Sequence, residues 1–128
     1  IKLILENKPI TIYGDGKSSR DYTYVTDVSD ALIASTKLNG YEIFNVGGGS
    51  ATTLNNLVKI IESLLEKKAI IQNIPRDPSD VEHSLADITK ISKILNWQPK
   101  YNIEQGVKET GKWFLDNLDF ISSINLKD

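Results

Sequence analysis

Apolar residues recur at helical spacing in several stretches of the chain, and these stretches predict its helices. The clearest helix follows Thr53, a residue type that caps helix N-termini. Its apolar face consists of Leu54, Leu57, Val58, Ile61, Leu64 and Leu65. Further helices are expected over residues 25–38, after a cap at Asp87, and over residues 103–118, while the mostly apolar residues 1–7 are typical of the tail of a helix.

Short runs of alternating or continuous apolar residues between turn signals predict strands. They fall at residues 10–13, 21–24, 41–46 and 69–74, and Gly14–Gly16 is predicted to turn the chain after the first. Strands that alternate with helices indicate the α/β fold class. These strands are too few and too short for a complete doubly wound sheet, so we expect part of a larger domain.

The chain of 128 residues has room for one hydrophobic core. Residues 1–118 carry all of the periodic segments, and residues 119–128 form an aperiodic tail that is expected to fray. The sequence contains no methionine and begins with Ile1, so we interpret it as a fragment of a longer protein.

Composition excludes several classes of function. A net charge of −2 argues against nucleic-acid binding, and the absence of cysteine excludes disulfides and cysteine nucleophiles. The single histidine, His83, cannot form a His-rich metal site and is expected to be exposed in its polar loop. No apolar run is long enough to span a membrane and no signal peptide opens the chain, so a cytoplasmic protein is expected.

Two motifs that resemble cofactor chemistry are interpreted as turns. Tyr13 and Lys17 have the Tyr-x-x-x-Lys spacing of a short-chain dehydrogenase pair, but Gly-Asp-Gly lies between them instead of a helical turn, so we reject this pair. Gly47–Gly49 follows a predicted strand and could approach a phosphate. Since GxGxxG is absent, a sharp turn that brings the backbone close to a neighbour or ligand is favoured over a dinucleotide site.

The two arginines of the chain, Arg20 and Arg76, lie in predicted loops. The guanidinium fork suits bidentate contact with phosphate, and binding residues concentrate in loops. The alternative is surface ion pairs, for example of Arg20 with Asp15 or Asp21, and these residues alone leave both interpretations open. The nearby Tyr22 could stack on a base or sugar, or could equally be an ordinary strand residue.

Three long segments together resemble one enzyme family, in order and at nearly matching spacing. They are IYGDGKSSRDYTYVTDVSDAL, FNVGGGSATTLNNLV and PRDPSDVEHSLADITKISKILNWQPKYNIEQGVKETGKWF. They resemble the extended short-chain dehydrogenase/reductases of the NAD-dependent epimerase/dehydratase family, notably UDP-glucose 4-epimerases. The resemblance covers residues 1–118 and implies a C-terminal, nucleotide-sugar-binding portion that lacks the N-terminal Rossmann half.

The resemblance also implies a role for individual residues. By position, Tyr13 would lie against the uracil and Arg20 would contact the diphosphate. Leu54 would line the nucleotide pocket, and Asp80 would hold the ribose hydroxyls.

Two loop positions depart from the family's pattern. The family's loop arginine lies three residues before the aspartate, whereas Arg76 lies one residue further from Asp80, and it would reach the phosphate if the loop accommodates the extra residue. Ser84 stands where a large aromatic residue narrows the pocket beside the sugar's C2 substituent. A serine should leave room for an N-acetyl group.

The resemblance implies that NAD oxidises the sugar's 4-hydroxyl, that the 4-keto sugar rotates, and that the hydride returns to its other face. The Rossmann half would hold NAD and supply the catalytic residues, so this chain is expected to bind a UDP-sugar and to hold no cofactor itself. Alternatives are a 4,6-dehydratase, a UDP-glucuronate decarboxylase, or a free-standing nucleotide-binding module without catalysis. The intact enzyme is expected to be a homodimer, and the isolated chain to self-associate because residues 25–46 would lack sheet partners.

Overall fold

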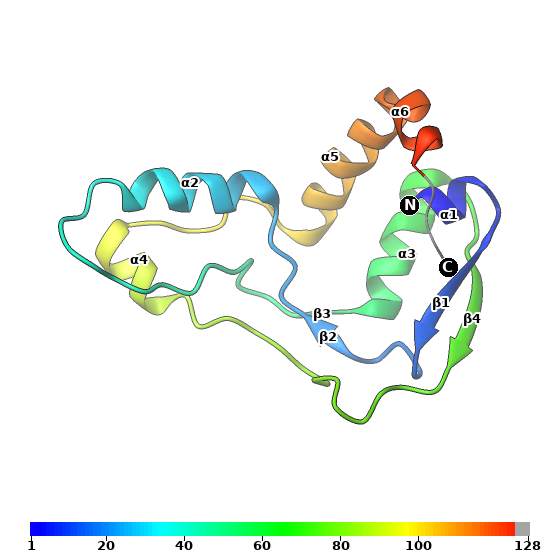
Figure 1. The fold of residues 1–128 in the computed structure, drawn as a ribbon, viewed down its shortest axis with the longest axis horizontal. Coiled ribbons are helices and arrows are strands. Elements are labelled where there is room, and N and C mark those ends of the chain that lie inside the picture. Colours follow the sequence, from blue (N-terminus) through cyan, green and yellow to red (C-terminus); the bar gives the residue numbers. More distant parts are fainter. Residues whose placement is uncertain (125–128) are drawn as a thin grey trace.

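The structure, a computed structural model, describes residues 1–124, in which short strands and helices alternate. The helices are α1 Lys2–Leu5, α2 Val25–Ser35, α3 Leu54–Leu65, α4 Thr89–Leu95, α5 Ile103–Asp116 and α6 Leu118–Ser123. The strands are β1 Pro9–Tyr13, β2 Ser19–Arg20, β3 Thr52–Thr53 and β4 Ile70–Ile74. α2 and α4 lie at one end of the molecule, and α3, α5, α6 and the β1–β4 pair lie at the other (Figure 1). This arrangement confirms the predicted α/β class.

The four strands form two separate pairs. β1 and β4 are parallel, with a register that runs from Pro9↔Ile70 to Tyr13↔Ile74. β2 and β3 are antiparallel, with Ser19 opposite Thr53. The strands predicted at residues 10–13 and 69–74 are therefore confirmed, and their carboxyl ends lie side by side.

Helix α3 begins and packs as its sequence predicts. The Thr53 side chain caps it by accepting a hydrogen bond from the Asn56 backbone N–H at 3.2 Å. Its apolar face packs against α5 at Gly111, where an added Cβ would lie 2.2 Å from Leu64 Cδ2. The helices approach this closely because glycine has no side chain.

A buried carboxylate joins α2 to the connector before α5. Asp27 is 1% exposed, and its carboxylate accepts hydrogen bonds from the backbone N–H groups of Lys100, at 3.0 Å, and Tyr101, at 3.1 Å. The indole N–H of Trp97 donates to the Asp27 carbonyl oxygen at 3.2 Å. Trp97 also packs with Ala31 and Ile91 in a buried cluster, so this one aspartate fixes both ends of the connector against α2.

Two of the predicted strands are wrong. Residues 41–46 form no strand, because no described segment pairs with them, and Tyr41 is 84% exposed. Residues 21–24 also form no strand, and the strand lies earlier, at Ser19–Arg20. The chain leaves the ladder at Asp21, whose carboxylate accepts hydrogen bonds from the backbone N–H groups of Gly48 and Ala86 instead.

Several element ends also differ from the prediction. Helix α2 stops at Ser35, before the predicted end at residue 38. The N-cap of α4 is Ile88 and not Asp87, although the Asp87 carboxylate still accepts a hydrogen bond from the Thr89 N–H at 2.9 Å. The predicted frayed tail is helical from residue 119 to the end of α6 at residue 123, and residues 125–128 lie outside the described part.

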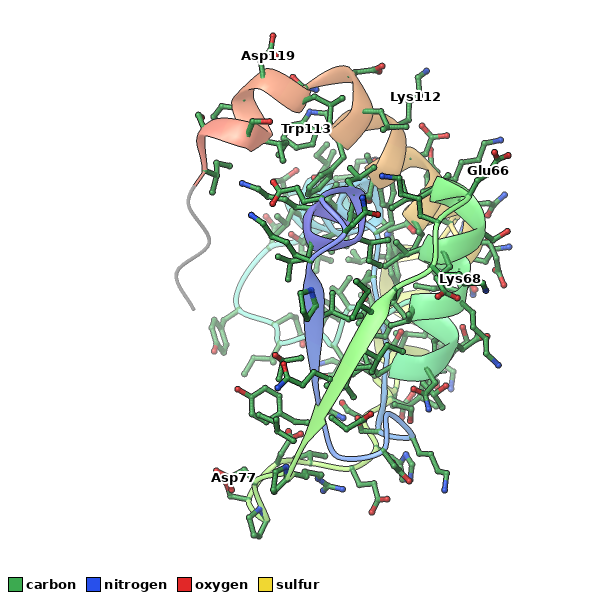
Figure 2. All side chains as sticks on the ribbon, turned by 90° about the vertical axis from the view of Figure 1, so that its right-hand side faces the viewer. Glu66, Lys68, Asp77, Lys112, Trp113 and Asp119 are labelled. Atoms are coloured by element: carbon green, nitrogen blue, oxygen red, sulfur yellow. The ribbon has the colours of Figure 1, made fainter. Side chains whose placement is uncertain are left out.

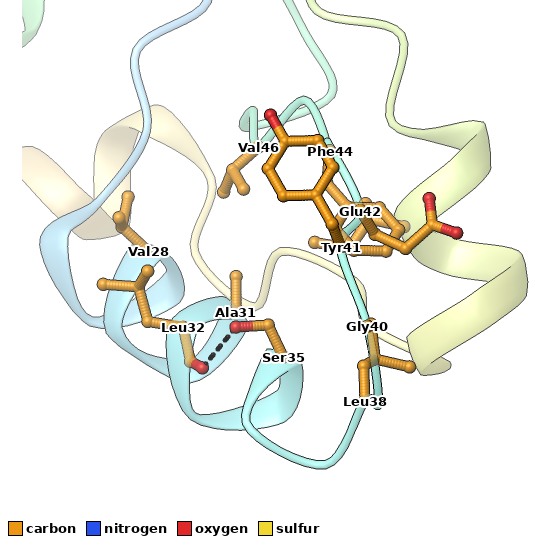
Figure 3. Close-up of a pocket in the computed structure, with 11 residues that line it drawn as sticks. Val28, Ala31, Leu32, Ser35, Leu38, Gly40, Tyr41, Glu42, Phe44 and Val46 are labelled. Atoms are coloured by element: carbon orange, nitrogen blue, oxygen red, sulfur yellow. Dashed lines mark hydrogen bonds between the residues drawn. The ribbon is translucent and has the colours of Figure 1, made fainter.

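α2 and the segment after it form an open apolar groove of about 370 Å³ (Figure 3). Its apolar lining includes Val28, Ala31, Leu32, Leu38, Phe44 and Val46. Leu32 and Ile33 are each 64% exposed, so one face of α2 has little cover among the described residues. This is the helix that was expected to lack a sheet partner.

We predict that the chain studied alone self-associates through this face, because contiguous exposed apolar surface favours burial against another molecule. Light scattering should show species larger than a monomer, and replacing Leu32 and Ile33 with glutamine should reduce them. Replacing the exposed, polar Lys37 of the following turn with glutamine is the control and should change nothing. A monodisperse monomer with protected amides in residues 41–46 would contradict the prediction.

Candidate functional site

The candidate site lies where β1 and β4 end. The loop after β4, which carries Asp77, lies at the bottom of the view in Figure 2, whereas Trp113 of α5 and Asp119 of α6 lie at its top. Tyr13, the last residue of β1, is 59% exposed. The next residue, Gly14, has φ +81° and accepts a hydrogen bond from the Asn73 side chain at 2.7 Å, so the turn begins directly after Tyr13.

The turn after β1 is bound to the start of α3. Gly16 has φ +73°, and an added Cβ there would lie 2.0 Å from Asn55 Oδ1. Asn55 donates from its backbone N–H to the Gly16 carbonyl at 3.0 Å and from its side chain to the Asp15 carbonyl at 2.9 Å. Lys17 forms an ion pair with Asp15 at 3.1 Å. As predicted, a glycine-containing loop separates Tyr13 from Lys17, and not one turn of a helix.

Arg20 reaches from β2 to the loop after β4. Its Nη1 donates to the carbonyl oxygens of Ser19, at 2.9 Å, and Glu82, at 3.3 Å. Its Nη2 donates to Asp80 Oδ1 at 2.8 Å. The Arg20 side chain is one-third exposed, at 33%, so this ion pair faces solvent on one side. Asp80 is therefore the partner of Arg20, and neither Asp15 nor Asp21 is.

Arg76 approaches the same aspartate from the other side. Its Nη2 donates to the Asp80 carbonyl oxygen, and its Nη1 lies 3.8 Å from Glu82 Oε2. The side-chain stem packs on Gly14, where an added Cβ would lie 3.3 Å from Arg76 Cβ. Its Nε is buried and has no hydrogen-bond partner among the described residues. The two guanidinium groups thus converge on Asp80.

Ser19 holds the segment around His83 against β2. The Ser19 N–H donates to the Glu82 carbonyl at 2.9 Å, and the Ser84 N–H donates to the Ser19 carbonyl at 3.1 Å. Between these bonds, Ser19 Oγ and His83 Nδ1 are 2.9 Å apart. His83 is exposed as a residue, as predicted, but Ser19 and Glu82 were missed, and no sequence spacing links partners 64 residues apart.

Six of the seven predicted site residues lie around β2 and the end of β1. Leu54 is placed there because its N–H donates to the Ser18 carbonyl at 3.0 Å and because the preceding Thr53 pairs with Ser19. Tyr22 lies elsewhere. It lines a cavity of about 220 Å³ between α3 and α5, and neither arginine lines this cavity.

The glycine turn brings the backbone close to Asp21. Gly48 N–H donates to Asp21 Oδ1 at 2.7 Å, and an added Cβ at Gly47 would lie 2.4 Å from Asp21 Oδ2. The favoured interpretation of a close approach to a neighbour is therefore confirmed. The Asp21 carboxylate therefore occupies the Gly48 N–H, which a phosphate would otherwise use.

The comparisons with known proteins assign the chain to a family. A family profile described as GDP-mannose 4,6 dehydratase matches residues 1–110. The chain belongs to this family. The match confirms the resemblance to extended short-chain dehydrogenase/reductases, whose solved epimerase structures the chain matches in their C-terminal portions.

Several known proteins and solved structures are similar to most of this chain. A UDP-glucuronate 4-epimerase of Thermodesulfobacterium geofontis is 44% identical over 127 residues, which cover 98% of this chain and 39% of that protein. UDP-glucuronic acid decarboxylase 1 of Arabidopsis thaliana is 30% identical, over 80% of this chain and 24% of that protein.

The crystal structure of UDP-glucose 4-epimerase from Thermotoga maritima with UDP-glucose has a TM-score of 0.86 and 34% identity, over 91% of this chain and 38% of that one. The chain thus spans roughly two fifths or less of the length of these relatives. No helix within residues 1–124 is long and apolar enough to cross a membrane.

Proposed function

We propose that this chain is the UDP-sugar-binding portion of an NAD-dependent nucleotide-sugar 4-epimerase. The observation that carries the proposal is the convergence of Arg20 and Arg76 on Asp80 beside the exposed ring of Tyr13. Similarity to a UDP-glucuronate 4-epimerase and to a UDP-glucose 4-epimerase with bound UDP-glucose supports the choice of substrate class.

The contacts of Asp80 suggest how a diphosphate would enter. Arg20 now donates to the Asp80 carboxylate, and a phosphate oxygen would take this place because it accepts from the same guanidinium fork. Asp80 would then be free to accept hydrogen bonds from the ribose hydroxyls. Arg76, whose Nε lacks a partner, supplies a second cation beside the phosphates.

The proposed contribution of this chain to the reaction is affinity and orientation. Contacts to the UDP group are remote from the reacting sugar carbon, and they hold the sugar in the geometry that the chemical step requires. The chemistry that NAD would supply when bound is to accept a hydride from the sugar's C4 and to return it. We assign the cofactor to sequence outside residues 1–128 because Asp21 occupies the Gly48 N–H, and the acid/base pair likewise because a glycine turn separates Tyr13 from Lys17.

A titration of the purified protein with UDP and with uridine tests the proposed site. Uridine lacks the diphosphate, so UDP should bind at least roughly tenfold more tightly, as expected from one charge-assisted contact or more. High salt should reduce this difference because it screens the partly exposed arginines. Equal affinity for the two ligands, or no binding of UDP, would overturn the proposal.

We also predict that the enzyme accepts UDP-N-acetylhexosamines, because Ser84 is small where a large aromatic residue would narrow the pocket. Ser84→Tyr should lower the kcat/KM for UDP-N-acetylglucosamine by roughly tenfold or more and leave that for UDP-glucose nearly unchanged. Steady-state assays of the intact enzyme measure both. The prediction is wrong if the parent enzyme is inactive on UDP-N-acetylglucosamine and the Ser84→Tyr variant behaves as the parent does.

Two other reactions remain candidates because of specific matches. The matching family profile is described as a dehydratase, and the Arabidopsis relative is a decarboxylase. Mass spectrometry of the product distinguishes the three after the intact enzyme has acted on nucleotide sugars with NAD. An epimerase yields an isomer of unchanged mass, a dehydratase a product lacking water, and a decarboxylase a product lacking carbon dioxide.

A further inference from the structure

We propose that the hydrogen bond between Ser19 and His83 positions Arg20 and Asp80 for the diphosphate, which makes His83 a positioning residue of the nucleotide site. We call this bond the Ser19–His83 latch. The inference rests on the proposed UDP site and adds a pair of residues to it that touch neither phosphate nor sugar in the proposed mode.

The latch joins a buried residue to an exposed loop. Ser19 is 7% exposed, and its Oγ lies 2.9 Å from His83 Nδ1. Residues 81–84 make no other side chain-to-side chain hydrogen bond with β2 in the part of the chain that the structure describes. Their backbone is in neither helix nor strand, apart from a single bridge between Ser19 and His83. The latch therefore restrains a loop that has little regular structure of its own.

The bonds on either side of His83 connect the latch to Arg20. The Glu82 carbonyl accepts from the Ser19 N–H at 2.9 Å and from Arg20 Nη1 at 3.3 Å. A shift of this carbonyl would turn the guanidinium, and Arg20 Nη2 would lose its alignment with Asp80. Without the latch, the contacts left to Glu82 are the backbone bond from Ser19, the bond from Arg20 itself and a 3.8 Å ion pair with Arg76. Arg20 and Asp80 would therefore become less well ordered.

Affinity for UDP in a small set of variants tests the latch. His83→Ala should weaken UDP binding by roughly three- to tenfold, as expected for loss of one net hydrogen bond. Ser19→Ala should weaken it equally, and the double variant should be no weaker than either single one, because both remove the same bond. His83→Asn can place a donor and acceptor near the Nδ1 position and should recover most of the affinity.

A matched control and the rescue separate positioning from general destabilisation. Ser29→Ala removes another serine hydroxyl, which donates to the Val25 carbonyl within α2, and it should leave UDP affinity unchanged. The latch is overturned if His83→Ala binds UDP as tightly as the parent, or if the losses of affinity in the Ser19 and His83 double variant are additive. In either case, UDP binding by the parent would still support the proposed site. If the parent does not bind UDP, the proposed function fails and the latch fails with it.

Discussion

Replacing Asp27 with alanine should destabilise the protein by roughly 2–6 kcal/mol, because the two backbone N–H groups that donate to its buried carboxylate would each lose their partner at a cost of about 1–3 kcal/mol. The carboxylate that now accepts from Lys100 and Tyr101 is nearly inaccessible to water, at 1% exposure of the residue, so solvent cannot replace it. Urea or thermal unfolding measures the loss. Asp27→Asn should lie between parent and alanine, because its amide keeps only one acceptor oxygen.

Asp30 is the matched control for Asp27. It lies three residues further along α2 and pairs with the Lys100 side chain at 2.6 Å, but this ion pair is exposed to solvent. Asp30→Ala should therefore cost at most about 1 kcal/mol. Equal destabilisation by the two alanine variants would show that the hydrogen bonds from the connector backbone to Asp27 do not determine the stability of the connector.

Replacing Arg20 with alanine should weaken UDP binding by roughly ten- to a hundredfold, since a charge-assisted hydrogen bond contributes about 1.5–3 kcal/mol. Two effects act in the same direction. The variant removes the donor fork and also leaves the Asp80 carboxylate without its cation beside the incoming diphosphate. Arg20→Lys should recover only part of the loss, because lysine keeps the charge but not the planar fork.

Lys17 is the control for Arg20. It is a cation of the turn before β2, and its ammonium pairs with Asp15 at an exposed site, with 78% of its side chain accessible. Lys17→Ala should change UDP affinity less than roughly twofold, because an exposed pair contributes little. Isothermal titration of the two variants measures both effects. Equal affinities of Arg20→Ala and the parent would remove Arg20 from the proposed phosphate site.

The structure shows which of the predicted site residues the fold brings together and which it does not. Arginine chemistry and family resemblance pointed to Arg20, Arg76 and Asp80, and the structure places these three side by side. Tyr22 was expected either to stack on a base or sugar or to be an ordinary strand residue. The chain turns away from β2 at Asp21 and carries Tyr22 to the cavity between α3 and α5. The direction of a side chain after a two-residue strand depends on which distant backbone groups are available for hydrogen bonding, and no local sequence pattern predicts this.

The sequence by itself determined the elements whose signals are local. The cap at Thr53, the apolar face of α3, the alternation in β1 and the short apolar run of β4 are set by neighbouring residues, and each was predictable. Only the tertiary structure decided what depends on distant partners. Residues 41–46 have strand-forming side chains but no strand to pair with among the described residues. Asp27 and Ser19 carry no local signal, and they act through bonds to Tyr101 and His83, 74 and 64 residues away, because hydrogen bonding is fixed by proximity in space and not in sequence.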